Sequence, residues 1–376
     1  MKIIIIGTAY PYRGGGLATF NERLANEYIS QGHDVEIFTF TLQYPSFLFP
    51  GKTQYSDEPA PPGLKITRAI NSINPFNWFK VGKRIREKQP DLVLIRFWIP
   101  FMAPCLGTIA RRIRKNNKIR IISILDNIIP HEKRIGDHVL SQYFLDSVDG
   151  FVVMSKSVLN DINAFKTEKP RVFSPHPLYD NFGEKVSREE ALEKLSLDHS
   201  QRYILFFGFI RDYKGLDLLL KAYADERFRS QNVKLIVAGE FYNNPEQYFR
   251  LEKELGLAGS IIWLNDFIPN SEVRYYFNAA DIIVQPYKSA TQSGVTQIAY
   301  HFEKPMLVTN VGGLPEIVPD GKVGYCVNTN EKEIADALID FYQNKRFENY
   351  FTDNIIKEKE KYAWSKMTET ITQIIN

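Results

Sequence analysis

The chain has 376 residues, which is enough for two domains of ordinary size, and its apolar and charged fractions are those of a soluble globular protein. Two cysteines far apart in the sequence, Cys105 and Cys326, argue against a disulfide framework or a zinc site and for a reducing compartment such as the cytoplasm. The opening run MKIIIIG is too short for a signal peptide, and no stretch reaches the roughly 18 apolar residues of a membrane-spanning helix.

The net charge of +3 is unevenly distributed along the chain. Residues 1–180 hold 24 Lys and Arg against 16 Asp and Glu, a balance of +8, whereas the remainder has a balance of −5. Basic residues lie beside aromatic ones at 75–88, and a second basic patch follows at 111–118. This pattern indicates an anionic partner for the first half: a membrane surface, a phosphorylated lipid or a nucleic acid.

Short apolar runs and amphipathic segments alternate through the first half, which predicts a parallel β-sheet with connecting helices. The loop at 8–16 follows the first strand, ends in three glycines and precedes a helix with apolar residues at helical spacing. The strand–glycine loop–helix unit is typical of nucleotide binders, but it lacks G-x-G-x-x-G, so a nicotinamide or flavin site is poorly supported. Strands are expected at 2–7, 34–39, 64–68, 91–96, 119–125 and 150–154, and helices at 17–31 and 75–88.

A segment rich in proline and turn formers at 170–183 predicts a domain boundary, after which the β/α pattern starts again. We therefore expect an α/β protein with domains at 1–180 and 181–357. Strands are expected at 203–208, 233–239, 261–264, 281–285 and 306–309, and helices at 216–223, 271–279, 331–346 and 355–376.

Three groups of residues in the expected loops carry chemistry. Arg211 and Lys214 follow a strand on one loop, and two cations there can neutralise a diphosphate. Ser293 and Gly294 begin a helix whose N–H groups and dipole form a second phosphate site. Asp126 and His131 follow another strand, at the end where open α/β sheets place their sites.

The order of these motifs resembles the retaining nucleotide-sugar glycosyltransferases of family 4. The resemblance is carried by Gly15-Gly16, by Gly208 through Lys214-Gly215-Leu216-Asp217, by Gly239-Glu240, and by Lys304-Pro305 through Gly312-Gly313-Leu314-Pro315-Glu316. It implies the GT-B fold, with two facing Rossmann-like domains and a C-terminal helix, here 358–376, returning to the first domain. It also implies a nucleotide-sugar donor bound mainly by the second domain, a glycan or lipid-linked acceptor bound by the first, and no obligatory metal or other cofactor.

The resemblance assigns donor contacts residue by residue. Lys214 falls at the family's diphosphate lysine, and Arg211 substitutes for an arginine whose usual place is taken by Phe209. The implied donor-binding residues are Gly15, Gly16, Arg211, Lys214, Glu240, Phe267, Ser293, Gly294, Val295 and Gln297. The family's two glutamates, separated by seven residues, fall near Ser289 and Gln297, so the sugar half of the site departs from the pattern.

The catalytic assignment is carried over in the same way. A histidine of many relatives aligns with Asp126, with His131 five residues on, and either could position the acceptor hydroxyl or stabilise charge on the sugar. We expect a glycosyltransferase of polysaccharide or cell-envelope glycan biosynthesis, cytoplasmic and peripheral at the inner membrane face, with no nucleic-acid partner. The alternatives are a non-catalytic nucleotide-sugar-binding subunit, which the missing glutamates keep open, and a nucleotide-sugar epimerase or a phosphorylase of the same fold.

Overall fold

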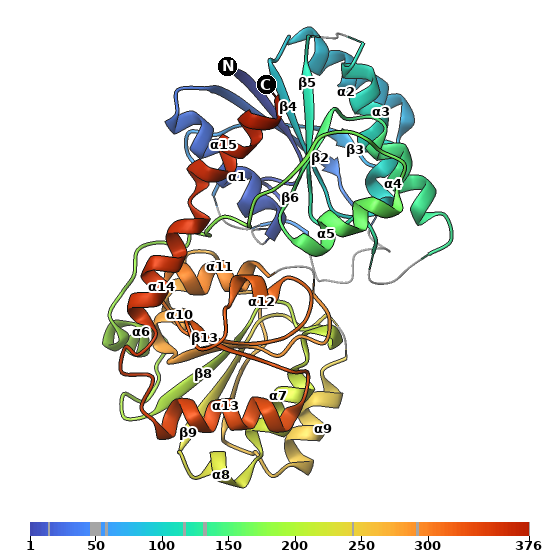
Figure 1. Cartoon of the computed structure of the whole chain (residues 1–376). Helices are drawn as coiled ribbons and strands as arrows, with labels where there is room; N and C mark the ends of the chain where they lie inside the picture. Colours follow the sequence, from blue (N-terminus) through green and yellow to red (C-terminus); the bar gives the residue numbers. More distant parts are fainter. Residues whose placement is uncertain are drawn as a thin grey trace. The chain divides into compact units, whose positions relative to one another are not determined.

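The computed structural model describes residues 1–13, 16–45, 54–56, 59–115, 118–130, 134–242, 244–290 and 293–375. The chain divides into two compact units, each an α/β fold built on a parallel sheet (Figure 1). Unit 1 contains residues 1–177 and 362–376, and unit 2 contains residues 178–361. Within the described ranges, no helix is long and apolar enough to cross a membrane.

The sheet of unit 1 has seven strands in the order β3-β2-β1-β4-β5-β6-β7. Its strands read as near-continuous apolar runs because helices cover both faces. The strands are β1 (Lys2–Ile6), β2 (Asp34–Leu42), β3 (Lys65–Asn71), β4 (Leu92–Phe97), β5 (Arg120–Leu125), β6 (Gly150–Val153) and β7 (Arg171–Phe173). The helices are α1 (Gly16–Ser30), α2 (Pro75–Glu87), α3 (Ala103–Ile113), α4 (Asp137–Leu145), α5 (Lys156–Asp161) and α15 (Trp364–Ile375), with 3-10 turns at Pro100–Met102 and Ile162–Ala164.

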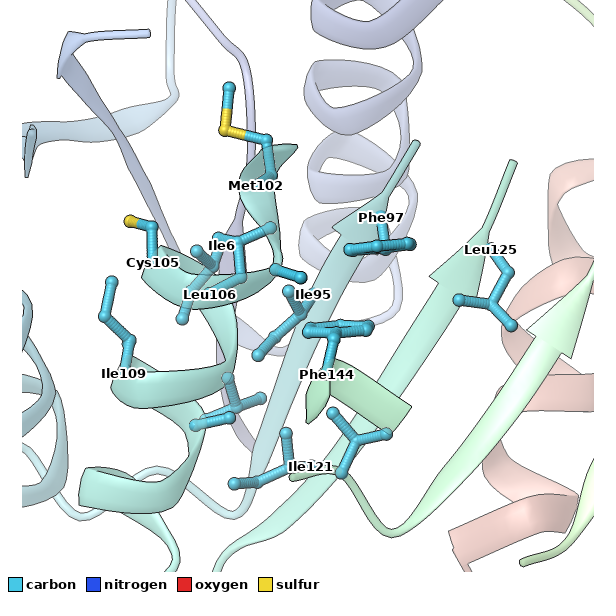
Figure 2. Close-up of a cluster of buried hydrophobic side chains, with 14 of the residues drawn as sticks. Ile6, Ile95, Phe97, Met102, Cys105, Leu106, Ile109, Ile121, Leu125 and Phe144 are labelled. Carbon is cyan, nitrogen blue, oxygen red and sulfur yellow. The ribbon is translucent and has the colours of Figure 1, made fainter. Parts of the chain in front are cut away.

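The core of unit 1 forms where α3 and α4 pack on the middle strands (Figure 2). The rings of Phe97 on β4 and Phe144 on α4 stack with centroids 4.2 Å apart, and Cys105 on α3 is fully buried. The C-terminal helix α15 packs against α1, and Gln31 Nε2 donates a hydrogen bond of 2.9 Å to Thr368 Oγ1. The last segment of the chain is therefore part of unit 1, although unit 2 separates the two in sequence.

The sheet of unit 2 has six strands in the order β10-β9-β8-β11-β12-β13. The strands are β8 (Arg202–Phe207), β9 (Val233–Ala238), β10 (Ile261–Leu264), β11 (Ile282–Gln285), β12 (Met306–Thr309) and β13 (Gly324–Val327). The helices are α6 (Arg188–Lys194), α7 (Leu216–Tyr223), α8 (Glu226–Arg229), α9 (Glu246–Glu254), α10 (Val273–Ala279), α11 (Gly294–His301), α12 (Leu314–Ile317), α13 (Glu331–Gln343) and α14 (Thr352–Lys359), with 3-10 turns at Asp212–Lys214 and Glu360–Tyr362.

Both strand orders reverse direction beside the first strand of their sheet. The reversal lies between β1 and β4 in unit 1 and between β8 and β11 in unit 2. Open α/β sheets bind ligands at the carboxyl ends of the strands at this switch point. The strand arrangement confirms the predicted α/β class and places the candidate site of each unit.

Candidate functional site

The site of unit 2 is built from two loops that follow β8 and β11. The first loop leaves β8 at Gly208 and reaches α7 through Gly215, which has a φ of +71°. A Cβ on Gly215 would lie 1.9 Å from the carbonyl oxygen of Pro286 in the second loop. Only glycine therefore permits this approach, and the hydrogen bond from Lys288 N to Tyr213 O, 2.6 Å long, holds the loops together.

Lys214 lies at the centre of this arrangement. Its side chain is 9% exposed, and among the described residues no hydrogen-bond or ion-pair partner meets its ammonium group. Its contact is with the ring of Tyr287, whose centroid is 5.7 Å from Nζ. Burial, followed by the positive charge of Arg211, lowers the pKa of Lys214 to about 7. The folded unit thus holds an amine that is about half protonated near pH 7 and that has no counter-charge among the described residues.

The first turn of α11 lies close to this lysine. A Cβ built on Gly208 would be 3.2 Å from Lys214 Nζ and 3.9 Å from a methyl carbon of Val295. Gly208, Lys214 and Val295 therefore converge at the switch point. Such a position combines a cation with the positive end of a helix dipole, which is an arrangement that attracts phosphate.

Ser293 begins α11, as the sequence predicts. Its Oγ accepts a hydrogen bond of 3.2 Å from Val295 N, and Thr296 Oγ1 donates to the Ser293 carbonyl at 2.6 Å. Gly294 is required by packing, because a Cβ there would lie 2.6 Å from the ring of Tyr179. The helix start is thus fixed both by its cap and by a close contact within unit 2.

Gln297 lies on α11, two residues after Val295. Its side chain is fully buried, and both its amide nitrogen and its amide oxygen are without a hydrogen-bond partner among the described residues. Gln285 at the end of β11 shows the same two features. The contact of Gln297 with a ribose hydroxyl stays a prediction. Ser289 is half-buried.

The remaining predicted residues of unit 2 lie around the same edge of the sheet. Arg211 is exposed, and its guanidinium group lies 4.7 Å from the ring centroid of Tyr242. Glu240 is buried directly after β9, and its carbonyl accepts a hydrogen bond of 2.8 Å from Ile210 N. Phe267 follows β10, with its ring 6.2 Å from that of Phe209. These residues surround the loop that carries Lys214.

In unit 1, Asp126 is held by an arginine that sequence reasoning did not single out. Arg96 on β4 donates to the Asp126 carboxylate through Nε at 2.7 Å and Nη2 at 2.9 Å. Both side chains are buried. The third nitrogen of the guanidinium group, Nη1, donates to the carbonyl of Gly16 at 2.9 Å. Arg96 therefore ties the end of β5 to the first residue of α1.

The surroundings of Arg96 complete this cluster. Its guanidinium group lies 4.0 Å from the ring centroid of Phe20, which in turn makes an edge contact with His176. Burial, followed by the charge of Arg96, lowers the pKa of His176 to about 3, so the imidazole is neutral at physiological pH. Gly16 begins α1, whereas Gly15 and His131 lie outside the described residues. A charged residue within the apolar run LVLIRF was the signal for Arg96.

Comparison with known proteins agrees with this geometry. The family described as "Glycosyl transferases group 1" matches residues 187–358, and "Glycosyltransferase Family 4" matches residues 14–176. An uncharacterised glycosyltransferase of Methanocaldococcus jannaschii is 24% identical over 381 aligned residues, covering 100% of this chain and 97% of the relative.

Solved structures share the fold at low identity. Sucrose-phosphate synthase from Thermosynechococcus elongatus matches with a TM-score of 0.77 and 15% identity, covering 99% of this chain and 98% of that chain. HepE of Anabaena, in complex with UDP and glucose, matches with a TM-score of 0.73 and 14% identity over the same shares. The chain belongs to the family 4, group 1 glycosyltransferases and has the GT-B fold.

Proposed function

We propose that this glycosyltransferase moves a sugar from a nucleoside-diphosphate sugar to a glycan or lipid-linked acceptor, with retention of anomeric configuration and without a metal ion. The observation that carries the proposal is Lys214, a residue only 9% exposed, whose ammonium has no hydrogen-bond or ion-pair partner in the described part of unit 2 and lies beside the first turn of α11. A buried cation is costly without a counter-charge, so the free protein is prepared for an anion.

The chemistry of the leaving group explains why this position matters. As the glycosidic bond of the donor breaks, negative charge develops on the diphosphate oxygen. Lys214, the nearby Arg211 and the dipole of α11 stabilise that charge more strongly than they stabilise the intact donor. Electrostatic stabilisation by fixed groups of this kind takes the place of a bound metal ion.

The retaining mode is supported by what surrounds Asp126. Its two carboxylate oxygens each accept a hydrogen bond from Arg96, so both are already engaged within unit 1. In the proposed reaction the departing phosphate oxygen accepts the proton of the acceptor hydroxyl, and no side-chain base is needed. Asp126 then acts by position and charge. His131 stays a prediction.

The donor and the setting are inferred from different observations. HepE, which shares the fold, is solved with UDP and glucose, and this supports a nucleotide-sugar donor. The excess of Lys and Arg in residues 1–180 supports an acceptor at an anionic membrane surface, reached from the cytoplasm. Polysaccharide or cell-envelope glycan synthesis is the process that fits a lipid-linked acceptor of this kind.

The test combines binding and transfer. Calorimetry with UDP and GDP identifies the nucleotide, and incubation with a panel of nucleotide sugars and a lipid extract measures transfer. Lys214→Ala should abolish nucleotide binding, whereas Lys221→Ala, at an exposed lysine of α7, should leave it unchanged. Equal binding by both variants would refute the assignment of Lys214. Nucleotide binding without transfer to any acceptor would favour a non-catalytic donor-binding subunit.

A further inference from the structure

Helix α2 presents an apolar surface that unit 1 does not use. Phe76 is 87% exposed, Phe79 is 54% exposed, and Ile73, just before the helix, is 51% exposed. The helix is held in place by other residues: Val81 and Ile85 are buried, and Trp78 Nε1 donates to Asn71 O at 2.7 Å. The three exposed side chains are therefore not needed to dock the helix. Large exposed apolar groups that gather in one place mark an interaction site.

Cations follow these apolar residues along the same helix. Lys80 and Lys83 come four and seven residues after Phe76, a spacing that places them on the same side of the helix. Lys80 has no hydrogen-bond or ion-pair partner in the described part of unit 1, and Lys83 has the exposed Glu87 at 3.6 Å. The helix as a whole carries four cations and one carboxylate.

The second basic patch of the sequence has a different use. Arg111 on α3 donates to the backbone carbonyl of Tyr143 at 2.7 Å, and its guanidinium group lies 3.7 Å from the centroid of the Tyr143 ring. Arg114 pairs with Asp149 at 3.1 Å. These cations hold α3, which packs beside α2, to the neighbouring helix α4 and the segment after it (Figure 1). Lys88 and Arg84 of the first patch are likewise used within unit 1, by Glu36 and by the ring of Phe38, whereas Lys80 and Lys83 on α2 are exposed and, among the described residues, have no partner outside their own helix.

We propose that Ile73, Phe76, Phe79, Lys80 and Lys83 form a docking surface for an anionic phospholipid bilayer. The helix lies along the membrane plane, with the aromatic side chains among the headgroups and acyl chain ends, and with the ammonium groups on lipid phosphates. Aromatic rings together with exposed lysines match this interface in both polarity and charge. The inference deepens the membrane setting of the proposed function, and it does not depend on the donor site.

Vesicle co-sedimentation of the full chain tests this surface. Binding should be strong with phosphatidylcholine vesicles that contain phosphatidylglycerol, weak with phosphatidylcholine alone, and reduced by salt. Phe76→Ser/Phe79→Ser and Lys80→Glu/Lys83→Glu should each lower binding by about tenfold or more. The matched controls, Tyr350→Ser at a 59% exposed ring of unit 2 and Lys221→Glu, should bind as the wild type does.

Several results would overturn the inference. These are equal binding to both kinds of vesicle, unchanged binding by both double variants, or a loss of binding by the controls as well. If Phe76→Ser/Phe79→Ser instead changes the oligomeric state in solution and not vesicle binding, the surface contacts a second copy and the inference is wrong. Nucleotide binding measured without vesicles should be the same for all variants, so failure of the donor site is seen separately.

Discussion

Replacing Lys214 with methionine should make the ligand-free protein more stable while removing its affinity for nucleoside diphosphates. Methionine has a similar length and no charge, so the substitution removes a buried cation without opening a large cavity. The pKa of Lys214 falls from the usual 10.5 to about 7 in the folded protein, chiefly because burial disfavours the ammonium. A tenfold change in the proton affinity of a group on folding corresponds to about 1.4 kcal/mol of stability.

The sign and size of the effect follow from linkage. Below about pH 7 the lysine is charged in both states, and the folded state bears the full cost of roughly 5 kcal/mol. Between about pH 7 and 10.5 the unfolded chain holds more protons, so wild-type stability should rise with pH. The gain from Lys214→Met should therefore be largest near pH 6, where several kcal/mol are expected, and should shrink to about 2 kcal/mol near pH 9.

Nucleotide binding should require the charged form of Lys214, whereas folding favours the uncharged form. A bound diphosphate stabilises the ammonium, so binding above about pH 7 must take up a proton. Affinity for UDP should then fall by up to about tenfold per pH unit between pH 7 and 9. Calorimetry in buffers of different ionisation enthalpy measures the proton uptake directly.

Urea denaturation of wild type and Lys214→Met at several pH values checks the stability arm of this prediction. Lys221→Met, at an exposed lysine of α7, is the matched control and should change neither stability nor binding appreciably. Two results would refute the reasoning. One is equal or lower stability of Lys214→Met near pH 6. The other is a UDP affinity that stays constant from pH 7 to 9 in the wild type.

Three further substitutions test the packing around the two candidate sites. Arg96→Met removes the arginine that pairs with the buried Asp126 carboxylate and should lower the free energy of unfolding by about 3–5 kcal/mol. The double variant Arg96→Met/Asp126→Leu should recover much of this loss. Equal losses in the two variants would argue against the ion pair. His176 has a pKa of about 3, so the free energy of unfolding of the wild type should fall as pH drops below 6.5, by about 2–3 kcal/mol at pH 4.5. In His176→Gln the free energy of unfolding should depend less on pH over this range, which acid titration measures. Gly294→Ala places a Cβ 2.6 Å from the Tyr179 ring and should lower the urea midpoint by an amount equivalent to about 1–3 kcal/mol; an unchanged midpoint would show that the ring can move freely.

The sheets could be predicted from the sequence because their strands are buried on both faces. The run Ile3–Ile6 is fully apolar and forms β1 without competition from helical periodicity. β3 was harder to place: 64–68 was expected, whereas the strand is Lys65–Asn71. It lies at the edge of its sheet and mixes polar and apolar residues without regular alternation, so its ends depend on pairing with β2 and on the cap of α2.

The candidate site of unit 2 could be predicted from the sequence where residue type alone indicates the chemistry. A lysine after a glycine turn supplies a positive charge, and a serine before a helix supplies a cap, whatever residues surround them. Gln297 shows the limit of this approach. Successive residues of α11 from Val295 to Tyr300 are buried, so the helix has no solvent face that a periodicity argument could assign. Which of its polar groups meets a ligand depends on packing from several elements.

The candidate site of unit 1 depends on contacts between distant segments, which the sequence alone does not reveal. Arg96 and Asp126 are 30 residues apart, and they meet because β4 and β5 pair in a register that places Arg96 opposite Ile124. The carbonyl of Gly16 approaches from a third element, α1. No local pattern encodes this triple contact. A cation inside an apolar strand indicates that a partner exists, but it does not say which residue the partner is.

Cations inside the two units differ in whether the fold itself supplies them with a partner. Arg96 is matched by the carboxylate of Asp126, and Lys304 donates to the carbonyls of Asn278 at 3.2 Å and Ala280 at 3.0 Å. Each of these groups is satisfied by the fold that buries it. Lys214 is 9% exposed, and within the described ranges its ammonium contacts the ring of Tyr287 and has no hydrogen-bond or ion-pair partner. Because folding gains nothing from leaving this charge unmatched, the missing partner is best supplied from outside the chain, by an anion such as the diphosphate of a sugar donor.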